Sequence, residues 1–401
     1  MTGFNHLQSV LLDLMNIPAT YFERLTSMHS TGYASAGVCT IRSSRLFVSS
    51  MRPTPSGLTR YFAANKILPI KPKVFTQYAV QPALFLSSKI IVKPALRCLA
   101  LVLIASVCGS QSQAETMILP PVDVDLIGNI RITRALQGDT LLDVARRFDI
   151  GQDEIVFANP DVDRWLPREG TQVVIPSRYI LPPVERSGIV LNIPEMRLYY
   201  FPPAAANKQA LVQTYPVSIG RMDWATPIGL TKILSKSENP SWRPPKSIRE
   251  EAEAHGEPLP EIIPAGPDNP LGSYALRLAR PGYLIHGTNK PFGVGMQVTH
   301  GCVRMYPEDI EKFFPQVPVG TAVQIVDQPV KIGWLFDTLF IEVHPPLEEK
   351  QQEPSVLLET AIDLIDVARQ QQPLVLDSYA LKQALEKQNG IPTAVGQSVR
   401  D

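Results

Sequence analysis

The chain has 401 residues, of which 44% are hydrophobic, and a formal net charge of zero, so it is long enough for two or three globular domains. The charge is unevenly distributed: residues 1–114 contain 11 basic residues against only Asp13 and Glu23, whereas the remainder contains 27 basic and 36 acidic residues. An acidic main part has no electrostatic reason to bind nucleic acid, and that class of partner is excluded. The 38 prolines favour a β-rich protein with long loops over a helical bundle.

Residues 89–114 have the pattern of a signal peptide. Three basic residues precede a short apolar run that ends at Cys108, and small residues follow up to Ala114. This is the order of a positive n-region, an apolar h-region and a cleavage site, so we expect cleavage after Ala114 and a periplasmic protein. The run is shorter than the roughly 20 residues of a membrane-spanning helix. A buried helix and a lipidated Cys108 are the alternatives.

Residues 1–88 resemble no domain. A signal peptide is expected at the start of a chain, so its position after residue 88 needs an explanation. Residues 1–88 are either the result of a translation start assigned too early or a disordered basic extension. Cleavage after Ala114 would remove Cys39, Cys98 and Cys108 and leave Cys302 alone. A lone thiol cannot form an internal disulfide, so Cys302 is either buried and inert or functional.

Residues 131–177 are predicted to form a small βααβ module. A strand near Ile132 leads to a helix capped by Thr140, a second helix ends at Asn159, and a strand follows Gly170. The segments Gly-Asp-Thr-Leu, Asn-Pro and Val-Val-Ile-Pro resemble those of a LysM module. The resemblance implies binding of N-acetylglucosamine-containing glycan, here peptidoglycan, through Gly138, Asp139, Thr140, Asn159 and Pro160. A packing module that binds nothing is the alternative.

Residues 186–327 are predicted to form the main domain, because most of its apolar runs are short and bounded by turn residues. The expected strands are 189–193, 197–201, 212–219, 230–235, 274–278, 283–286 and 322–326. An excursion over 236–270 is rich in Pro, Glu and Asn and contains a helix near 247–254, and a second helix begins at Pro307. The tail, residues 328–401, has a strand at 339–343 and helices over 356–370 and 378–388, and we expect it to pack on the main domain.

Two neighbouring segments carry the residues best suited to chemistry. The first ends a strand with His286-Gly287-Thr288, and the second is Thr299-His300-Gly301-Cys302-Val303-Arg304. A cysteine nucleophile needs a base or a cation nearby, and a histidine at a strand end facing the thiol can supply one. The small Gly287 and Gly301 admit close backbone approach, so that N–H groups can hold an oxyanion. Arg304 can offer a cation to a substrate carboxylate.

These segments resemble the YkuD-type L,D-transpeptidases, in particular the LysM-containing, lipoprotein-anchoring, ErfK-like group. The matching residues are His-Gly-Thr-Asn at 286–289, Gly-Met at 295–296 and Thr-His-Gly-Cys at 299–302. The resemblance implies a mainly β (α+β) fold, in which a YkuD-type β-sandwich catalytic domain follows the βααβ module. It also implies that the chain acts on peptidoglycan without a metal or an organic cofactor.

The same resemblance implies roles for the site residues. Cys302 would attack the amide between diaminopimelate and D-Ala of a tetrapeptide stem, release D-Ala and form a thioester. His286 would act as base and then as acid, oriented by the Gly287 carbonyl. Thr299 and His300 would line the site, Gly301 would contribute an amide and Arg304 would contact the stem.

Several alternatives remain at this stage. Cys302 could be an inert core thiol, or a zinc ligand with His286 and His300, and Arg304 could be a structural ion-pair partner. The acceptor is the C-terminal Lys of an outer-membrane lipoprotein, the diaminopimelate of another stem, or water, which would make the chain a carboxypeptidase. A non-catalytic wall-binding protein is the third hypothesis.

Overall fold

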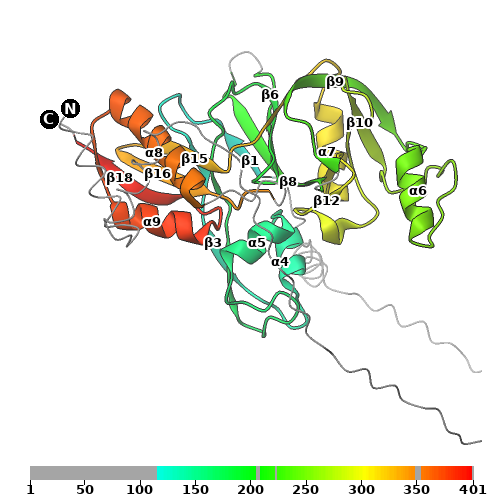
Figure 1. Ribbon diagram of the computed structural model, residues 1–401, viewed down its shortest axis with the longest axis horizontal. Coiled ribbons are helices and arrows are strands. Elements are labelled where there is room, and N and C mark those ends of the chain that lie inside the picture. The colour runs from blue at the N-terminus through cyan, green and yellow to red at the C-terminus, as the bar shows by residue number, and fades with distance from the viewer. Residues whose placement is uncertain (1–114, 205–207, 222–223, 348–353, 400–401) are drawn as a thin grey trace, which may run out of the picture. The chain divides into compact units, whose positions relative to one another are not determined.

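The structure is a computed structural model that describes residues 115–204, 208–221, 224–347 and 354–399 (Figure 1). The expected signal peptide, the extension before it, and Cys39, Cys98 and Cys108 lie outside the described residues. Within the described part, no helix is both long enough and apolar enough to cross a membrane.

The largest sheet has ten strands, and eight of them form a closed ring. The order β8-β13-β11-β10-β9-β14-β6-β7 closes because β7 also pairs with β8, while β1 and β12 join β8 from outside the ring. The strands are β1 (Glu115–Ile118), β6 (Gly188–Asn192), β7 (Arg197–Phe201), β8 (Leu211–Gly220), β9 (Gly229–Glu238), β10 (Tyr274–Leu278), β11 (Leu284–His286), β12 (Gln297–Thr299), β13 (Val303–Met305) and β14 (Ala322–Val326). The fold is therefore mainly β with some helices.

Helix α7 (Pro307–Gln316) supplies aromatic side chains to the core of this sheet. Pro307 starts the helix, where its missing N–H costs no hydrogen bond. The Phe313 ring is fully buried and meets Tyr200 and Tyr215 edge to face, with centroids 5.4 and 5.2 Å away. Such pairs add stability beyond their buried area. The helix thus holds together β7 and β8, the strand that ends beside the candidate site.

A βααβ module, in the predicted order, lies in sequence between β1 and the other strands of this sheet. Strand β3 (Arg131–Arg134) pairs with β4 (Gln172–Ile175), and α4 (Leu141–Arg147) and α5 (Gln152–Ala158) lie between them in sequence. The module has a core of its own. Two further short strands, β2 (Leu126–Gly128) and β5 (Arg178–Ile180), flank it and pair with each other.

Hydrogen bonds fasten the module to the loop before β12. The backbone N–H groups of Gln152 and Asp153, in the first turn of α5, donate to the carbonyls of Val294 and Gly295 at 3.0 and 3.1 Å. The buried guanidinium of Arg197 pairs with Glu154 at 2.6 Å. This loop leads directly into Thr299-His300-Gly301-Cys302, so the module is held against the segment that carries the candidate nucleophile.

The C-terminal tail is a small α+β unit of its own. Four antiparallel strands in the order β15-β16-β18-β17 pack against two helices around a separate apolar core (Figure 1). These elements are β15 (Val330–Leu335), β16 (Thr338–Val343), α8 (Pro354–Gln371), β17 (Leu374–Leu376), α9 (Ser378–Lys387) and β18 (Thr393–Ser398). The sequence predicted one of these strands and both helices. The apolar side chains of the tail pack mainly against one another.

A buried charge network joins this unit to the main sheet. Lys331 of β15 is fully buried, and its Nζ lies 2.9 Å from Glu195, 2.8 Å from Glu342 and 2.6 Å from the carbonyl of Ile180. Burial alone would lower the pKa of Lys331, but the two carboxylates raise it, so the ammonium stays charged. The network therefore depends on all three charges being present together.

Candidate active site

The pairing of two short strands brings the candidate base and nucleophile together. Strand β11 ends at His286 and runs parallel to β13, with Ile285 opposite Val303 and His286 opposite Arg304. Cys302 directly precedes β13 and so lies opposite Leu284, two residues from the level of His286 on the neighbouring strand. The backbone of Leu284 hydrogen-bonds to the thiol of Cys302, and the thiol lies 3.7 Å from the carbonyl of Gly282.

His286 is held in one neutral tautomer. Its ring is 5% exposed, and Nδ1 lies 2.6 Å from the carbonyl oxygen of Gly287. A carbonyl only accepts, so Nδ1 carries the proton and Nε2 is the candidate basic atom. The backbone of Leu271 also hydrogen-bonds to this ring. Burial, together with the nearby cation of Arg304, lowers the pKa of His286 to about 4. The imidazole is therefore uncharged and able to accept a proton at neutral pH.

Cys302 is half-buried and in the thiol form. Burial raises its pKa above the ordinary value of 9.0, against the opposing effects of the Leu284 backbone and of Arg304. The resting site thus pairs a neutral thiol with a neutral imidazole. A base that removes the thiol proton as the sulfur attacks suits this state better than a preformed ion pair.

Glycine and two hydroxyl groups fix the turn that carries the thiol. Gly301 has φ +92°, and a Cβ on it would lie 2.8 Å from the ring of Tyr283, so no other residue fits without strain. The hydroxyl of Thr299 donates to the Cys302 carbonyl at 2.6 Å, and that of Thr226 donates to the Gly301 carbonyl at 3.1 Å. These bonds orient the peptide groups on both sides of the nucleophile.

His300 and Arg304 have different surroundings. The Nε2 of His300 lies 2.7 Å from Glu251, and its ring meets Trp224 edge to face at 5.3 Å. Arg304 forms no ion pair with any described residue, and its Nε is buried without a hydrogen-bond partner. The structure therefore shows no ion pair that would give Arg304 a structural role among the described residues.

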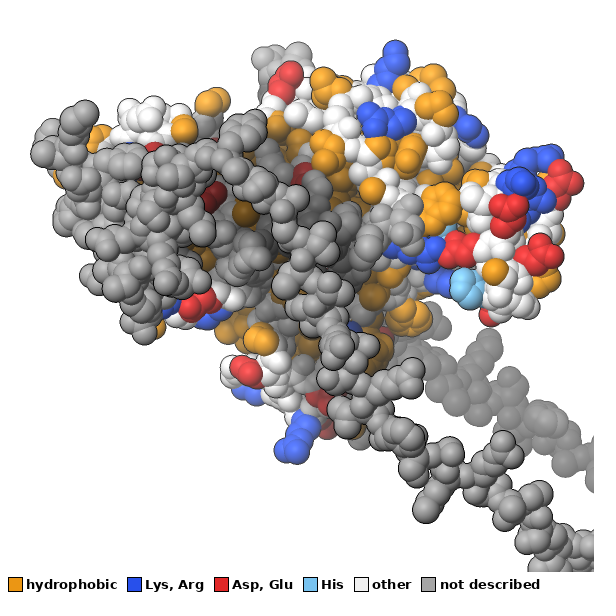
Figure 2. Space-filling view, viewed as in Figure 1, with side chains coloured by type: hydrophobic (Ala, Val, Ile, Leu, Met, Phe, Trp, Pro, Cys, Tyr) orange, Lys and Arg blue, Asp and Glu red, His pale blue; other side chains and the backbone are white. Residues whose placement is uncertain are grey.

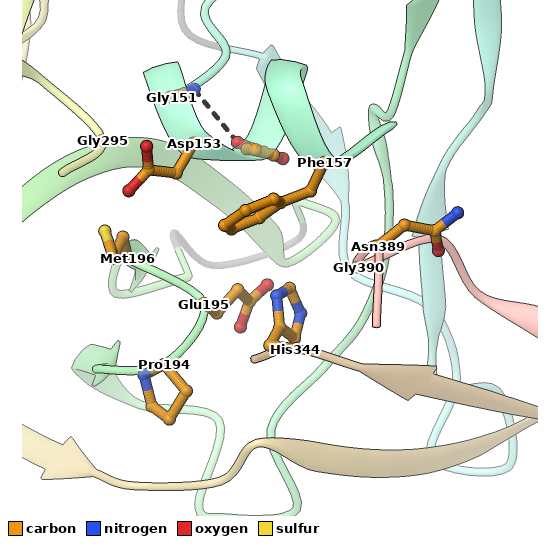
Figure 3. A pocket seen from close by; sticks show the side chains of 11 residues that line it. Gly151, Asp153, Phe157, Pro194, Glu195, Met196, Gly295, His344, Asn389 and Gly390 are labelled. Atoms are coloured by element: carbon orange, nitrogen blue, oxygen red, sulfur yellow. Dashed lines mark hydrogen bonds between the residues drawn. The ribbon is translucent and has the colours of Figure 1, made fainter. Parts of the chain in front are cut away.

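The metal-ligating groups of the described residues gather elsewhere. Glu195, Glu342 and His344 have ligand atoms close together, but the ammonium of Lys331 bonds to both carboxylates and provides the cation there. Glu195 and His344 also border a small pocket into which the ring of Phe157 projects (Figure 3). Neither Cys302 nor His286 lines this pocket.

The predicted glycan contacts of the module have structural roles. Asp139 pairs with Arg147 at 2.7 Å, which lowers its pKa, and Thr140 caps α4. The Asn159 amide donates to the carbonyls of Ile155 and Val174 at 2.8 Å. Gly138 borders Asp139 in the β3–α4 turn and has φ +82°, and Pro160 directly follows Asn159 at the end of α5. These side chains hold the two loops in shape.

Sequence reasoning missed two groups of residues. Trp165 is 61% exposed and lies between α5 and β4, and its exposure was not visible in the sequence. Arg221, Trp224 and Glu251 surround His300, but they lie far from the motif in the chain. The only sequence feature that could have drawn attention to Glu251 was the Pro-rich excursion that contains it.

Comparison with known proteins identifies the family. Residues 186–325 match the family model YkuD, described as the L,D-transpeptidase catalytic domain. The chain is 40% identical over 289 residues to the Probable L,D-transpeptidase YbiS of Escherichia coli strain K12, a match covering 71% of this chain and 92% of that protein. It is 38% identical over 297 residues to the Probable L,D-transpeptidase ErfK/SrfK of the same strain, covering 72% and 93%. The chain therefore belongs to the YkuD family of L,D-transpeptidases.

Proposed function

We propose that this chain is a periplasmic L,D-transpeptidase that forms a thioester through Cys302. The observation that carries the proposal is the parallel pairing of β11 and β13, which sets His286 beside the turn that holds the thiol. A neutral imidazole on the strand beside a protonated thiol is an arrangement that suits general-base-assisted attack.

The reaction has two halves. In the first, Nε2 of His286 takes the thiol proton while the sulfur attacks the diaminopimelate carbonyl of a tetrapeptide stem. The imidazolium then gives this proton to the D-Ala nitrogen, the C–N bond breaks, and D-Ala leaves. In the second, an acceptor amine attacks the thioester, His286 removes the amine proton and returns it to the departing sulfur. The nearby cation of Arg304 favours the negative charge that develops during both attacks.

The acceptor in this proposal is an amine, either the C-terminal Lys of an outer-membrane lipoprotein or the diaminopimelate of a second stem. The test is mass spectrometry of tetrapeptide muropeptides incubated with the purified chain, with and without a peptide that ends in Lys. A cross-linked product or a Lys adduct is expected. Tripeptide alone would show water to be the acceptor and make the chain a carboxypeptidase. No turnover would favour the wall-binding hypothesis.

We further propose that the βααβ module is a LysM-type glycan-binding module. The loop between β3 and α4 lies beside the loop between α5 and β4, because the N–H of Leu141 donates to the carbonyl of Arg164 at 2.9 Å. The apolar side chains of Leu136, Trp165 and Leu166 are exposed on these loops. An exposed indole beside a loop pair is suited to stacking on a sugar ring.

Replacing Trp165 by alanine is therefore expected to weaken binding to purified peptidoglycan by about tenfold, which corresponds to about 1.4 kcal/mol. The measurement is co-sedimentation of the chain with insoluble sacculi. Tyr379→Ala removes a similarly exposed aromatic ring from α9 and should leave binding unchanged. Equal binding by the Trp165 variant and the parent chain would refute this role.

A further inference from the structure

The carboxylate of Glu251 bridges the side chains of Arg221 and His300 at the candidate site. One of its oxygens lies 2.7 Å from Nε2 of His300, and the other accepts a hydrogen bond from the Arg221 guanidinium. The bonds to Arg221 and His300 lower the pKa of Glu251, so the group is an anion at neutral pH. Each oxygen of the Glu251 carboxylate therefore contacts a different side chain, one Arg221 and the other His300.

Arg221 and His300 belong to the wall around the nucleophile. His300 lies two residues before Cys302, and the N–H of Arg221 donates to the carbonyl of Thr299 at 2.9 Å. Arg221 follows Gly220, and a Cβ on Gly220 would lie 2.8 Å from the Cα of Gly301. The end of β8 therefore packs directly on the turn that presents the thiol.

Glu251 comes from a helix with no buried side chain. Helix α6 (Lys246–Ala254) lies in the excursion between β9 and β10, and all its residues are partly or fully exposed. Figure 2 shows acidic and basic side chains gathered over the α6 region at the right of the view. The excursion is fastened at its base instead, where the Asn269 amide donates to the carbonyls of Pro240 and Pro264 at 2.7 and 3.0 Å. No fully buried side chain of α6 holds Glu251 in place.

The site also holds more cationic donors than Glu251 satisfies. The Nε atoms of Arg221 and Arg304 are buried without a hydrogen-bond partner. Buried guanidinium donors are normally paired, and a carboxylate is the acceptor that suits their geometry. The unpaired N–H donors could bind a second anion, or an anion that accepts more hydrogen bonds than Glu251 does.

We propose that Arg221 and His300 bind a carboxylate of the donor stem and that Glu251 occupies the place of that carboxylate until the donor displaces it. The inference rests on the proposed function, because the tetrapeptide stem is the source of the anion. Of the free carboxylates of the stem, those on the D-Ala terminus and on the diaminopimelate side chain lie nearest along the chain to the carbonyl that Cys302 attacks.

A different role for Glu251, orienting the imidazole of His300 as carboxylates often do, leads to the opposite expectation. If Glu251 only orients His300, its removal should disturb the site and weaken the binding of the donor. If Glu251 competes with the donor, its removal should make the donor bind more tightly. The direction of the change therefore separates the two roles.

The test is calorimetric measurement of tetrapeptide binding to the full chain carrying Cys302→Ala, so that no turnover is needed. Adding Glu251→Gln should lower the Kd by about three- to tenfold, and adding Arg221→Ala should raise it by at least about tenfold. The matched control is Glu250→Gln on the same helix, whose carboxylate pairs only with the exposed Lys246; its Kd should equal that of the parent.

Two modified donors identify the carboxylate. One is amidated on the diaminopimelate side chain and the other ends in D-alaninamide. Amidation of the group that Arg221 binds should weaken binding to the parent chain and remove the effect of Arg221→Ala. A weaker affinity in Glu251→Gln, or an unchanged Kd in Arg221→Ala, would overturn the inference. These results do not depend on activity, so absence of turnover in the wild-type chain would count against the proposed function alone.

Discussion

Replacing His286 by alanine is expected to lower kcat/KM for the tetrapeptide donor by about 10³-fold, within the usual contribution of a positioned general base. The reason is that the buried thiol of Cys302 has a raised pKa, so it needs a partner to take its proton during attack. The measurement is release of D-Ala under steady-state conditions. His255→Ala, which removes an exposed histidine at the end of α6, should retain full activity.

The pH dependence follows from the same two groups. Because the pKa of His286 is lowered to about 4, the imidazole should remain neutral at neutral pH and lose its basic form only in acid. We therefore expect kcat/KM to fall below about pH 4 and to be nearly constant from pH 5 to neutral. Alkylation of Cys302 by iodoacetamide should accelerate as pH rises past the ordinary thiol value. An alkylation rate already constant at neutral pH would indicate a preformed thiolate–imidazolium pair instead.

The second large effect is expected from Lys331→Met. The substitution keeps much of the side-chain volume but leaves Glu195 and Glu342 buried without their cation, and breaking a buried ion pair in this way costs about 3–5 kcal/mol. The free energy of unfolding at neutral pH, measured with urea, should fall by that amount. A triple variant that also carries Glu195→Gln and Glu342→Gln should recover part of the loss, because no unpaired charge remains.

The stability contributed by this network should depend on pH. Burial alone would raise the pKa of Glu342, but Lys331 and His344 hold it below its ordinary value of 4.5. A carboxyl group with a folded-state pKa below its unfolded value stabilises the fold above the unfolded pKa, and the contribution is lost as pH falls through the folded value. The difference between wild type and Lys331→Met should therefore shrink below about pH 4.5. A difference that stays constant or grows in acid would contradict this assignment.

The long strands were predictable because their apolar residues form short runs between turn signals. Strands β7, β10 and β14 occupy the predicted ranges. Strands β12 and β13 were not predicted, since each has three residues and their sequence is dominated by the functional motif. The tail strands β17 and β18 were missed for a related reason: several of their side chains are exposed, so they lack a clear apolar pattern.

The candidate nucleophile and base could be named from the sequence because both lie in one local motif, whereas their surroundings depend on tertiary structure. Glu251 meets His300 across 49 positions of sequence, and no pattern in either segment indicates that contact. In the module, the turn and capping residues were predicted to bind glycan because they carry the LysM resemblance. Thr140 and Asn159 form hydrogen bonds that shape the loops, and their binding of glycan stays a prediction, because capping and ligand-binding residues are of the same types in a sequence.

The most direct test of thioester catalysis is the intact mass of the chain after brief incubation with a tetrapeptide donor and no acceptor. We predict a mass increase equal to the donor minus D-Ala, located on the peptide that contains Cys302, and no such increase in Cys302→Ala. An unmodified protein that nevertheless releases D-Ala, or an adduct on another residue, would contradict the proposal that Cys302 is the nucleophile.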